Sequence, residues 1–511
     1  MNKYILFYIK TSKKEITDTN YDYIIIGSGL TGSYLAYQLS IKYPKKSILI
    51  IEQNKYSGGR IESNYIDNIK QNPLQIAYEF GGMRVFPDIH PRMMKLIKTF
   101  NLQTVKFPYK IPTNIFCGRN KTFLNNSLFP ATNISYNVNN NEKYKNTFNY
   151  VNKIIINIFK KYGLNYKNNI IHYNIRKKLY SNKELCNLNF KQELLNINNK
   201  YHISNENYNR FQDITGYSNI LNGNISFLAA TYDISFVNNY SKQLLIKNGS
   251  HNIIRNLLNK YKLFDNENIS NNLILYNNEF IKFENNGNEN ICYVRNNDSK
   301  KIIKLNCKKL FITVPSDKIR NIIGFKQEFY NNYFNNLVEL PLFRIFFYYK
   351  ENWWSKYGFK NGRCTTDLPF NQLWFYNNNT LMSYSAGDDA NYWLSLLPYK
   401  KQINFIDINN NNKLIDLVKR YLYFIKIMFK DYVNDIPFPD KISWSFNING
   451  QNIWNVNLDK NRSINDIKNK LIYSLEKDNI YYLNNDISLN QGWMEGCLET
   501  VDTFLLDNPN V

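Results

Sequence analysis

The chain has 511 residues, of which 43% are hydrophobic and 16% aromatic, and its formal net charge is +23. It is too long for one ordinary hydrophobic core, so we expect two or three domains with sizeable cores. Such a charge can indicate a nucleic-acid-binding protein, but the lysines are scattered through a sequence rich in Asn, Ile, Tyr and Phe. The composition therefore makes a dedicated nucleic-acid function unlikely.

The predicted elements alternate between strand and helix at the start of the chain. Residues 21–100 show this alternation, whereas residues 125–230 are rich in Asn, Lys and Tyr with patches of helical periodicity. The later expectations are strands over 271–315 and 342–350, a long helix over 411–432, and a strand, a loop and a helix over 480–506.

Cysteine and histidine usage argues against a disulfide framework and a metal site. The six cysteines form no C-x-x-C pair, and the four histidines do not cluster. The N-terminal apolar run Tyr4 to Ile9 is short for a signal peptide and far too short to span a membrane. We therefore expect a cytoplasmic protein without a bound metal or a membrane span; the oligomeric state is left open.

The most specific local pattern lies near the N-terminus. Gly27, Gly29 and Gly32 form G-x-G-x-x-G after an apolar strand and at the start of a helix that we expect to reach about Ser40. The first two glycines allow a tight turn close to a pyrophosphate, and the third lets the helix pack on the strand. Glu52 ends the next strand, where a carboxylate binds the ribose of an adenosine. The pattern predicts a dinucleotide site.

Two Gly-Gly pairs indicate which dinucleotide is bound. They are Gly58–Gly59, followed by Arg60, and Gly81–Gly82, followed by Met83 and Arg84. Repeated close backbone approach over this span fits an extended FAD better than NAD, with the flavin near the second pair. Arg60 is expected to bridge a phosphate or to shield the flavin.

Further motifs resemble a known family. Glu52 with the following Gly-Gly-Arg, the segments "NGRCTTDLPFNQLWFY" and "MSYSAGDDANYW", and the tail "NQGWMEGCLETV" are similar to the flavin amine oxidase superfamily, in particular its L-amino-acid oxidase branch. The resemblance covers roughly residues 21–90, 243–392 and 480–505. It is thin over 100–240.

The resemblance assigns catalytic roles to five residues. Arg84 would bind the substrate carboxylate, and Tyr384 would share it. Trp493 would wall the flavin face, with the backbone of Gly492 beside the substrate. Arg344 stands where the family usually has a lysine that holds a water near flavin N5, so oxygen reactivity is an open question.

The resemblance also implies further cofactor contacts. Met494 and Glu495 would start the last helix, which points at the flavin pyrimidine. The backbone of Phe280 would meet the adenine. Leu483 to Asn485 replace the usual Ala-Gly-Glu or Ala-Gly-Asp, so Asn485, or Asp486 after a one-residue shift, stands at an acidic contact to the ribityl chain. With no cysteine at the attachment position of monoamine oxidases, FAD would be non-covalent.

These inferences predict an α/β fold: a Rossmann-like FAD-binding domain with a mixed-sheet substrate domain and a helical insertion. The expected segments are 21–90, 241–330 and 471–511 for the FAD-binding domain, 91–124 and 331–470 for the substrate domain, and 125–240 for the insertion.

The favoured function is an FAD-dependent oxidase that deaminates an L-amino acid to a 2-oxo acid, ammonia and hydrogen peroxide, with O2 as electron acceptor. One rival is an amine or polyamine oxidase, which needs no carboxylate clamp. A second is a low-turnover FAD-binding protein with a structural or partner-binding role.

Overall fold

The structure is a computed structural model of the chain. It describes residues 19–66, 77–107, 115–124, 136–143, 145–164, 173–238, 243–263, 272–359, 362–377, 379–399, 401–408, 411–456 and 461–511. The apolar run Tyr4 to Ile9 and parts of the expected insertion, residues 125–135 and 165–172 among them, lie outside these residues.

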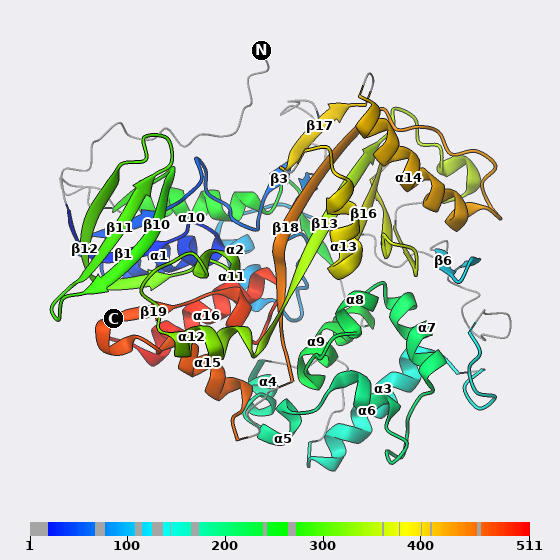
Figure 1. The fold of residues 1–511 in the computed structure, drawn as a ribbon, viewed down its shortest axis with the longest axis horizontal. Helices are drawn as coiled ribbons and strands as arrows, with labels where there is room; N and C mark the ends of the chain where they lie inside the picture. Colours follow the sequence, from blue (N-terminus) through cyan, green and yellow to red (C-terminus); the bar gives the residue numbers. More distant parts are fainter. Residues whose placement is uncertain are drawn as a thin grey trace. The chain divides into compact units, whose positions relative to one another are not determined.

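The chain divides into two compact units, each assembled from separate segments. The first unit comprises Met1–Val105, Leu244–Leu337 and Asn465–Val511, and the second comprises Lys106–Gln243 and Val338–Ile464. Figure 1 shows their helices and strands, coloured along the sequence.

The first unit contains a sheet with seven strands among the described residues, ordered β10-β11-β12-β1-β2-β9, with β19 also paired to β12. Strands β9, β2, β1, β12 and β19 run parallel, whereas β10 and β11 are antiparallel to their neighbours. The strands are β1 (Asn20–Ile26), β2 (Ile48–Ile51), β9 (Asn272–Leu275), β10 (Asn278–Asn285), β11 (Asn290–Asn296), β12 (Ile302–Ile312) and β19 (Ile480–Tyr482).

The parallel strands are apolar because helices cover them. All four residues of β2, with the sequence ILII, are buried, as expected of a central parallel strand. Helix α1 contacts both α10 and α16, and α16 also contacts α2. These helices are α1 (Leu30–Lys42), α2 (Pro91–Thr99), α10 (His251–Leu263) and α16 (Met494–Asp507).

The second unit contains a sheet with eight strands among the described residues, ordered β17-β18-β13-β16-β15-β14-β6-β7. One face is apolar and packs with α14 (Asn412–Phe429) around Phe343, Ile345, Phe347 and Trp444. The strands are β6 (Ile115–Gly118), β7 (Lys121–Leu124), β13 (Leu337–Tyr348), β14 (Gly362–Thr366), β15 (Gln372–Asn377), β16 (Thr380–Ala386), β17 (Ile403–Asp407) and β18 (Lys441–Trp454).

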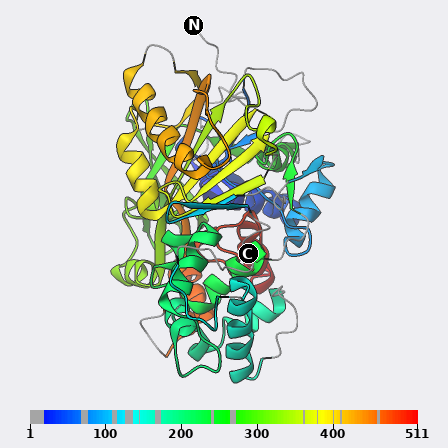
Figure 2. The same cartoon turned by 90° about the vertical axis from the view of Figure 1, so that its right-hand side faces the viewer.

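A group of helices joins β7 to the rest of the second unit. They are α3 (Thr147–Lys161), α4 (Tyr173–Leu179), α5 (Lys183–Cys186), α6 (Phe190–Leu195), α7 (Asn205–Thr215), α8 (Ser218–Leu221) and α9 (Phe227–Asn238). Helix α7 contacts β6 and β14, so the helices lie at one end of the sheet, below it in Figures 1 and 2. The helical periodicity noted in this region therefore reflects real helices.

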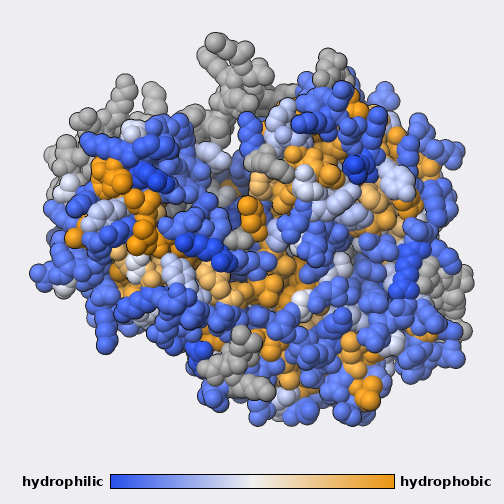
Figure 3. Space-filling view, in the orientation of Figure 1, coloured by the Kyte–Doolittle hydropathy of each residue, from blue (hydrophilic) through white to orange (hydrophobic). Residues whose placement is uncertain are grey.

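The other expected elements are also present, with small shifts at their ends. Helix α1 reaches Lys42, α14 lies within the expected 411–432, and β19, a 3-10 turn and α16 make up the tail. The α/β fold class is thus confirmed. Figure 3 shows hydrophilic residues over most of the visible face, with hydrophobic patches among them. The exposed apolar side chains include Ile197 and Leu506.

Candidate functional site

The turn after β1 is built by the three predicted glycines. Gly27 has φ +99°, a left-handed conformation that favours glycine. A Cβ on Gly32 would overlap the carbonyl oxygen of Gly27, so the helix can approach the strand only with glycine there. Gly29 is the N-cap of α1, and no side chain caps the helix. The first backbone N–H groups of α1 are therefore suited to an anion.

The first Gly-Gly pair lies against this turn. Gly29 and Gly58 form an isolated parallel bridge, and the N–H of Gly58 donates to the carbonyl oxygen of Ser28 at 3.2 Å. A Cβ on Gly59, which has φ +58°, would lie 3.3 Å from the Cα of Gly29. The turn after β1 and the Gly58–Gly59 turn belong to different sequence motifs. In the structure they form one continuous backbone surface.

Glu52 follows β2 directly and is buried. Its Oε2 accepts from the Ser28 N–H at 2.9 Å and from the Ser28 hydroxyl at 2.8 Å, and its Oε1 accepts from the Asn54 N–H at 2.8 Å. The carboxylate is therefore fixed against the glycine turn. A carboxylate oxygen accepts two hydrogen bonds, so Oε1 retains a lone pair.

The second Gly-Gly pair belongs to a segment held from both sides. The Gly82 N–H donates to the Arg60 carbonyl oxygen at 3.0 Å, and Val85 exchanges two 2.9 Å backbone hydrogen bonds with Leu244. A Cβ on Gly81 would overlap the Arg60 carbonyl, and one on Gly82 would lie 3.0 Å from the Met494 side chain. Close packing on both sides explains this glycine pair.

The same segment places Arg84 beside Trp493, which is the N-cap of α16. The Arg84 guanidinium carbon lies 5.5 Å from the Trp493 ring centroid. Phe86 meets the indole edge to face at 5.0 Å, and His90 lies 5.4 Å from it. The structure thus brings Arg84 to Trp493 and Gly82 to Met494, and Met83, which precedes Arg84, is buried.

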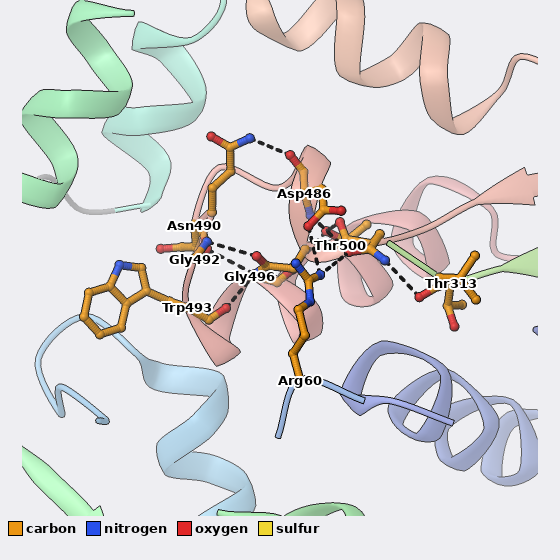
Figure 4. Close-up of polar contacts among 12 residues, drawn as sticks. Arg60, Thr313, Asp486, Asn490, Gly492, Trp493, Gly496 and Thr500 are labelled. Carbon is orange, nitrogen blue, oxygen red and sulfur yellow. Dashed lines mark hydrogen bonds and ion pairs between the residues drawn. The ribbon is translucent and has the colours of Figure 1, made fainter. Parts of the chain in front are cut away.

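An ion pair between a partly exposed arginine and a buried acid holds the loop that follows β19. Arg60 Nη2 lies 2.8 Å from Asp486 Oδ1 and donates to Asn484 Oδ1 at 3.0 Å. Asp486 is fully buried, and its Oδ2 accepts from the Tyr333 hydroxyl at 2.9 Å. Burial opposes the Arg60 charge, yet the adjacent Asp486 carboxylate raises the pKa of Arg60. Figure 4 shows Arg60 extending upward toward Asp486, with the Trp493 ring to the left.

The Asn485 carboxamide binds the later part of the same loop. Its Nδ2 donates to the carbonyl oxygens of Trp493 at 2.6 Å and Asn490 at 3.3 Å, and its Oδ1 accepts from the Gly492 N–H at 2.9 Å. Gly492 has φ +75°. The carboxamide thus closes the loop on itself.

Glu495 is buried in the first turn of α16, and its carboxylate binds α2. It accepts from the backbone N–H groups of Arg92 at 3.2 Å and Met93 at 2.9 Å, and it pairs with the Arg92 side chain at 3.2 Å. Burial raises the pKa of Glu495 despite these contacts. Since His90 makes no side-chain cap at the start of α2, Glu495 supplies the missing acceptor from another helix.

In the second unit, Arg344 and Tyr384 are direct cross-strand partners on β13 and β16. The Arg344 guanidinium carbon lies 5.0 Å from the Tyr384 ring centroid. Tyr384 is also the register partner of Gln372, which in turn pairs with Thr365. A row of polar side chains therefore crosses four strands, on the face opposite to the α14 core.

Asp389 in the first turn of α13 (Gly387–Leu396) supports the neighbourhood of Tyr384. Its Oδ2 accepts from Asn371 at 2.8 Å and from Asn219 at 2.6 Å, and burial raises its pKa. Asn371 has φ +48° and forms a bridge with Tyr384. Asp389 thus ties α8, the start of β15 and the Tyr384 strand together.

Phe280 lies in β10 with its backbone in the ladder opposite Val294, and its ring stacks on Phe283 at 6.3 Å. Sequence reasoning missed two residues that act through long-range pairing, Ser28 on Glu52 and Tyr333 on Asp486. It places Glu495 correctly at the start of the last helix, but it does not reveal that the Glu495 carboxylate binds α2. For α2 a signal was present, because Pro91 opens that helix without a capping side chain before it.

Comparisons with known proteins agree on one family and one fold. The family described as flavin containing amine oxidoreductase matches residues 28–407. An uncharacterized protein, R188, of Acanthamoeba polyphaga mimivirus is 24% identical over 519 residues, covering 95% of this chain and 93% of that protein. Achacin of Lissachatina fulica is 31% identical over 86 residues, 17% of this chain and 15% of that protein.

Two solved structures share the fold at low sequence identity. Cyclohexylamine oxidase from Brevibacterium oxydans has a TM-score of 0.63 at 12% identity, covering 94% of this chain and 97% of that one. A double mutant of putrescine oxidase has a TM-score of 0.60 at 14% identity, covering 96% and 99%.

The described residues contain neither a candidate membrane span nor a candidate metal site. None of their helices is both long enough and apolar enough to cross a membrane. Among the same residues, no group of three or more His, Cys, Asp and Glu side chains is placed to hold a metal ion.

Proposed function

Because this chain belongs to the family of flavin containing amine oxidoreductases, we propose that it is an FAD-dependent oxidase of an L-amino acid. The overall reaction converts the amino acid, O2 and water to a 2-oxo acid, ammonia and hydrogen peroxide. When bound, the flavin supplies the two-electron acceptor for the substrate Cα–H bond and passes the electrons to O2.

The residues of the first unit fit an FAD. The glycine turns at Gly27–Gly32 and Gly58–Gly59 leave a bare backbone surface beside the uncapped start of α1, which suits a pyrophosphate. Glu52 keeps one lone pair on Oε1 for a ribose hydroxyl, and its negative charge disfavours a 2′-phosphate. Phe280 remains the proposed neighbour of the adenine.

The cysteines support non-covalent binding. Cys497 lies on α16, and burial raises the pKa of its thiol. A protonated thiol is a poor nucleophile, so this side chain is not suited to attack a flavin. The proposed FAD is therefore released on denaturation.

Arg84 is the proposed carboxylate-binding residue, and its position beside Trp493 is the observation that carries the assignment. A guanidinium can stack on an aromatic ring, and its planar donor fork matches the geometry of a carboxylate. Trp493 would confine the substrate on one side, and the Gly492 backbone would line it. Tyr384 of the second unit is proposed as a further hydroxyl donor, with Arg344 as the charged group in place of the family's lysine.

The start of α16 is the proposed partner of the electronegative edge of the flavin. Trp493 is the N-cap and makes no side-chain cap, so the first N–H groups of the helix are not taken by a capping side chain. They favour negative charge at this end, together with the helix dipole. Glu495 does not oppose this role, because its carboxylate is paired with Arg92 at 3.2 Å.

The test is anaerobic flavin reduction by L-amino acids and by the amines left after their decarboxylation, with Arg84→Met beside the parent. Loss of a desolvated charge pair is worth about 2–5 kcal/mol, so kcat/KM for the amino acid should fall by about 30- to several thousand-fold. Arg320→Met removes an exposed arginine of the same unit and is the control. Equal activity of Arg84→Met and the parent would end the amino-acid claim.

An amine oxidase is the second candidate, favoured by the fold shared with cyclohexylamine oxidase and putrescine oxidase. It predicts faster reduction by a decarboxylated amine than by the amino acid. A low-turnover flavoprotein predicts reduction by neither, although the protein would still be yellow.

A further inference from the structure

The loop between β19 and α16 is organised by a carboxamide where the resemblance places an acid. We propose that Asn485 is a positioning residue that fixes Gly492 and Trp493 and does not itself bind the flavin. The acid of this loop is Asp486, whose charge Arg60 neutralises. The inference rests on the proposed function for what Gly492 and Trp493 do, but not for how they are held.

The hydrogen bonds of Asn485 match a carboxamide and no other side chain of its size. The loop offers it two carbonyl oxygens, of Trp493 and Asn490, and one N–H, of Gly492. A carboxamide has two N–H donors and an acceptor oxygen, whereas a carboxylate has only acceptors. Aspartate has the same shape, yet would bring negative charge against two carbonyl oxygens.

The space around Asn485 is also closed. The side chain is 7% exposed, and a Cβ on Gly496 would lie 2.5 Å from its Nδ2. Both Nδ2 hydrogens are committed to the loop, so Asn485 has no donor left for a flavin. Helix α16 thus begins at a point set by Asn485, because Trp493 is both its hydrogen-bond partner and the N-cap.

Asp486 is the acidic side chain of this loop, and its carboxylate is bound by other residues. Its two oxygens face Arg60 at 2.8 Å and the Tyr333 hydroxyl at 2.9 Å, away from Asn485. Gln491 reaches back across the loop and donates its Nε2 to the Asp486 carbonyl oxygen. Figure 4 shows the two sides: Asp486 toward Arg60, and Gly492 and Trp493 at the start of the helix.

The same helix tethers the loop further along. The Leu489 N–H donates to Glu499 Oε1 at 3.1 Å, and the Asn490 carboxamide donates to the other oxygen of Glu499. The Thr500 hydroxyl reaches the Asn484 carbonyl oxygen at 3.3 Å. These contacts hold residues 484–490, so Asn485 is left to set residues 490–493.

The experiment compares Asn485→Asp and Asn485→Ala with the parent, using the flavin-loaded full chain. Asn508→Asp is the matched control, because Asn508 also donates twice, to Phe504 and Tyr473, at the far end of α16. Amide hydrogen exchange at residues 486–493 reports the loop without any need for activity. Steady-state kinetics with an L-amino acid report the position of Trp493.

We expect exchange at the Gly492 amide to rise about tenfold or more in both Asn485 variants, and not in Asn508→Asp. KM for the amino acid should rise about tenfold, with flavin content unchanged. Asn485→Asp should be the worse variant at pH 8 and should recover part of the loss as pH falls, because protonation of the acid restores one donor.

Two outcomes would contradict the positioning role of Asn485. If Asn485 is a flavin ligand, Asn485→Asp restores the family's acid and should retain or tighten flavin binding without faster exchange. That outcome, or an effect no larger than in Asn508→Asp, would overturn the proposal. A parent chain that oxidises no amino acid would instead contradict the proposed function, while the exchange measurement would still test Asn485.

Discussion

The turn after β1 and the loop after β19 lie on either side of β12, and they are built by different means. Both leave parallel strands at their carboxyl ends, and both contact Thr313: its hydroxyl donates to the Ile26 carbonyl oxygen at 2.7 Å, and its carbonyl accepts from Asn484 at 2.9 Å. The turn after β1 is shaped by glycines. The loop after β19 is shaped by buried carboxamides and one ion pair. A close backbone approach thus requires small residues, whereas a wide loop requires side chains that replace water.

The largest effect should come from removing the glycine that lets α1 meet β1. In Gly32→Ala the new Cβ would overlap the Gly27 carbonyl and lie 2.8 Å from the Thr313 hydroxyl oxygen. The Gly27 carbonyl belongs to the backbone and cannot move aside as a flexible side chain could. We therefore expect the free energy of unfolding to fall by about 3 kcal/mol or more. We also expect the variant to lose its flavin. Urea unfolding and the visible flavin spectrum measure both.

Gly223→Ala is the control for this change. Its Cβ would meet the Ile225 side chain at 3.4 Å, an ordinary contact. If Gly32→Ala binds flavin as the parent does, the turn after β1 is not limited by backbone sterics, and the contrast with the loop fails.

An intermediate effect is expected in the loop, from Asp486→Asn. The variant keeps the shape but leaves the Arg60 charge without its partner. Loss of one member of a buried pair typically costs about 3–5 kcal/mol, and we expect about 2–3 kcal/mol here, because 23% of the Arg60 side chain is exposed. Chemical denaturation of the flavin-free protein measures it.

A double variant sharpens the same prediction. Arg60→Met with Asp486→Leu removes both charges, so it should be less destabilised than the sum of the two single variants. If the two single destabilisations add up to that of the double variant, the Arg60 and Asp486 side chains do not stabilise each other. The loop would then be held by its carboxamides alone.

The smallest effect should come from Asp213, a half-buried acid of the second unit whose neighbouring arginine pairs with another carboxylate. Burial raises the pKa of Asp213 to about 6, and the neighbouring Arg119 is paired with Glu206 at 2.7 Å. A pKa above that of the unfolded chain means that stability falls as pH rises from about 4 to about 6. Asp213→Asn keeps the acceptor for Tyr136 and should stabilise by about 1–2 kcal/mol at pH 8.

The gain should vanish at pH 4, where Asp213 is protonated in the folded chain. Melting temperatures at the two pH values measure this. Glu206→Gln should act with the opposite sign, because the hydrogen bond from Arg119 lowers the pKa of Glu206 to about 2. If Asp213→Asn lowers the melting temperature at pH 8, the ionised Asp213 does not destabilise the folded chain and the prediction is wrong.

The sequence predicts the site best where sterics leave little choice of residue. Gly27, Gly32 and Gly81 each occupy a place where a Cβ or an ordinary φ is excluded, so the spacing of the glycines is enough to reveal the turn. Strand β2 and Glu52 follow from the length of one βαβ unit. The α/β class and the helices of the insertion follow from periodicity in the same way.

The loop after β19 could not be predicted to the same depth. The pattern around Asn485 shows that an acid is missing, but it does not show that Arg60, more than 400 residues earlier, pairs with Asp486. The roles of Tyr333 and Glu495 likewise depend on which helix the fold places beside them. Such contacts leave no periodic trace in a sequence.

The order of strands in the first unit has a consequence for synthesis of the protein. Strand β19 pairs with β12, and α16 packs on α1, yet β19 and α16 begin more than 450 residues after β1. At about 5–20 residues per second, a ribosome needs roughly 20–90 s to travel that distance. The edge of β12 that will receive β19 is open for the last part of this time, the roughly 8–34 s between synthesis of Ile312 and Ile480. The last strand of the second unit's sheet ends at Trp454, before β19 begins. The nascent first unit is therefore the part of the chain most in need of a chaperone.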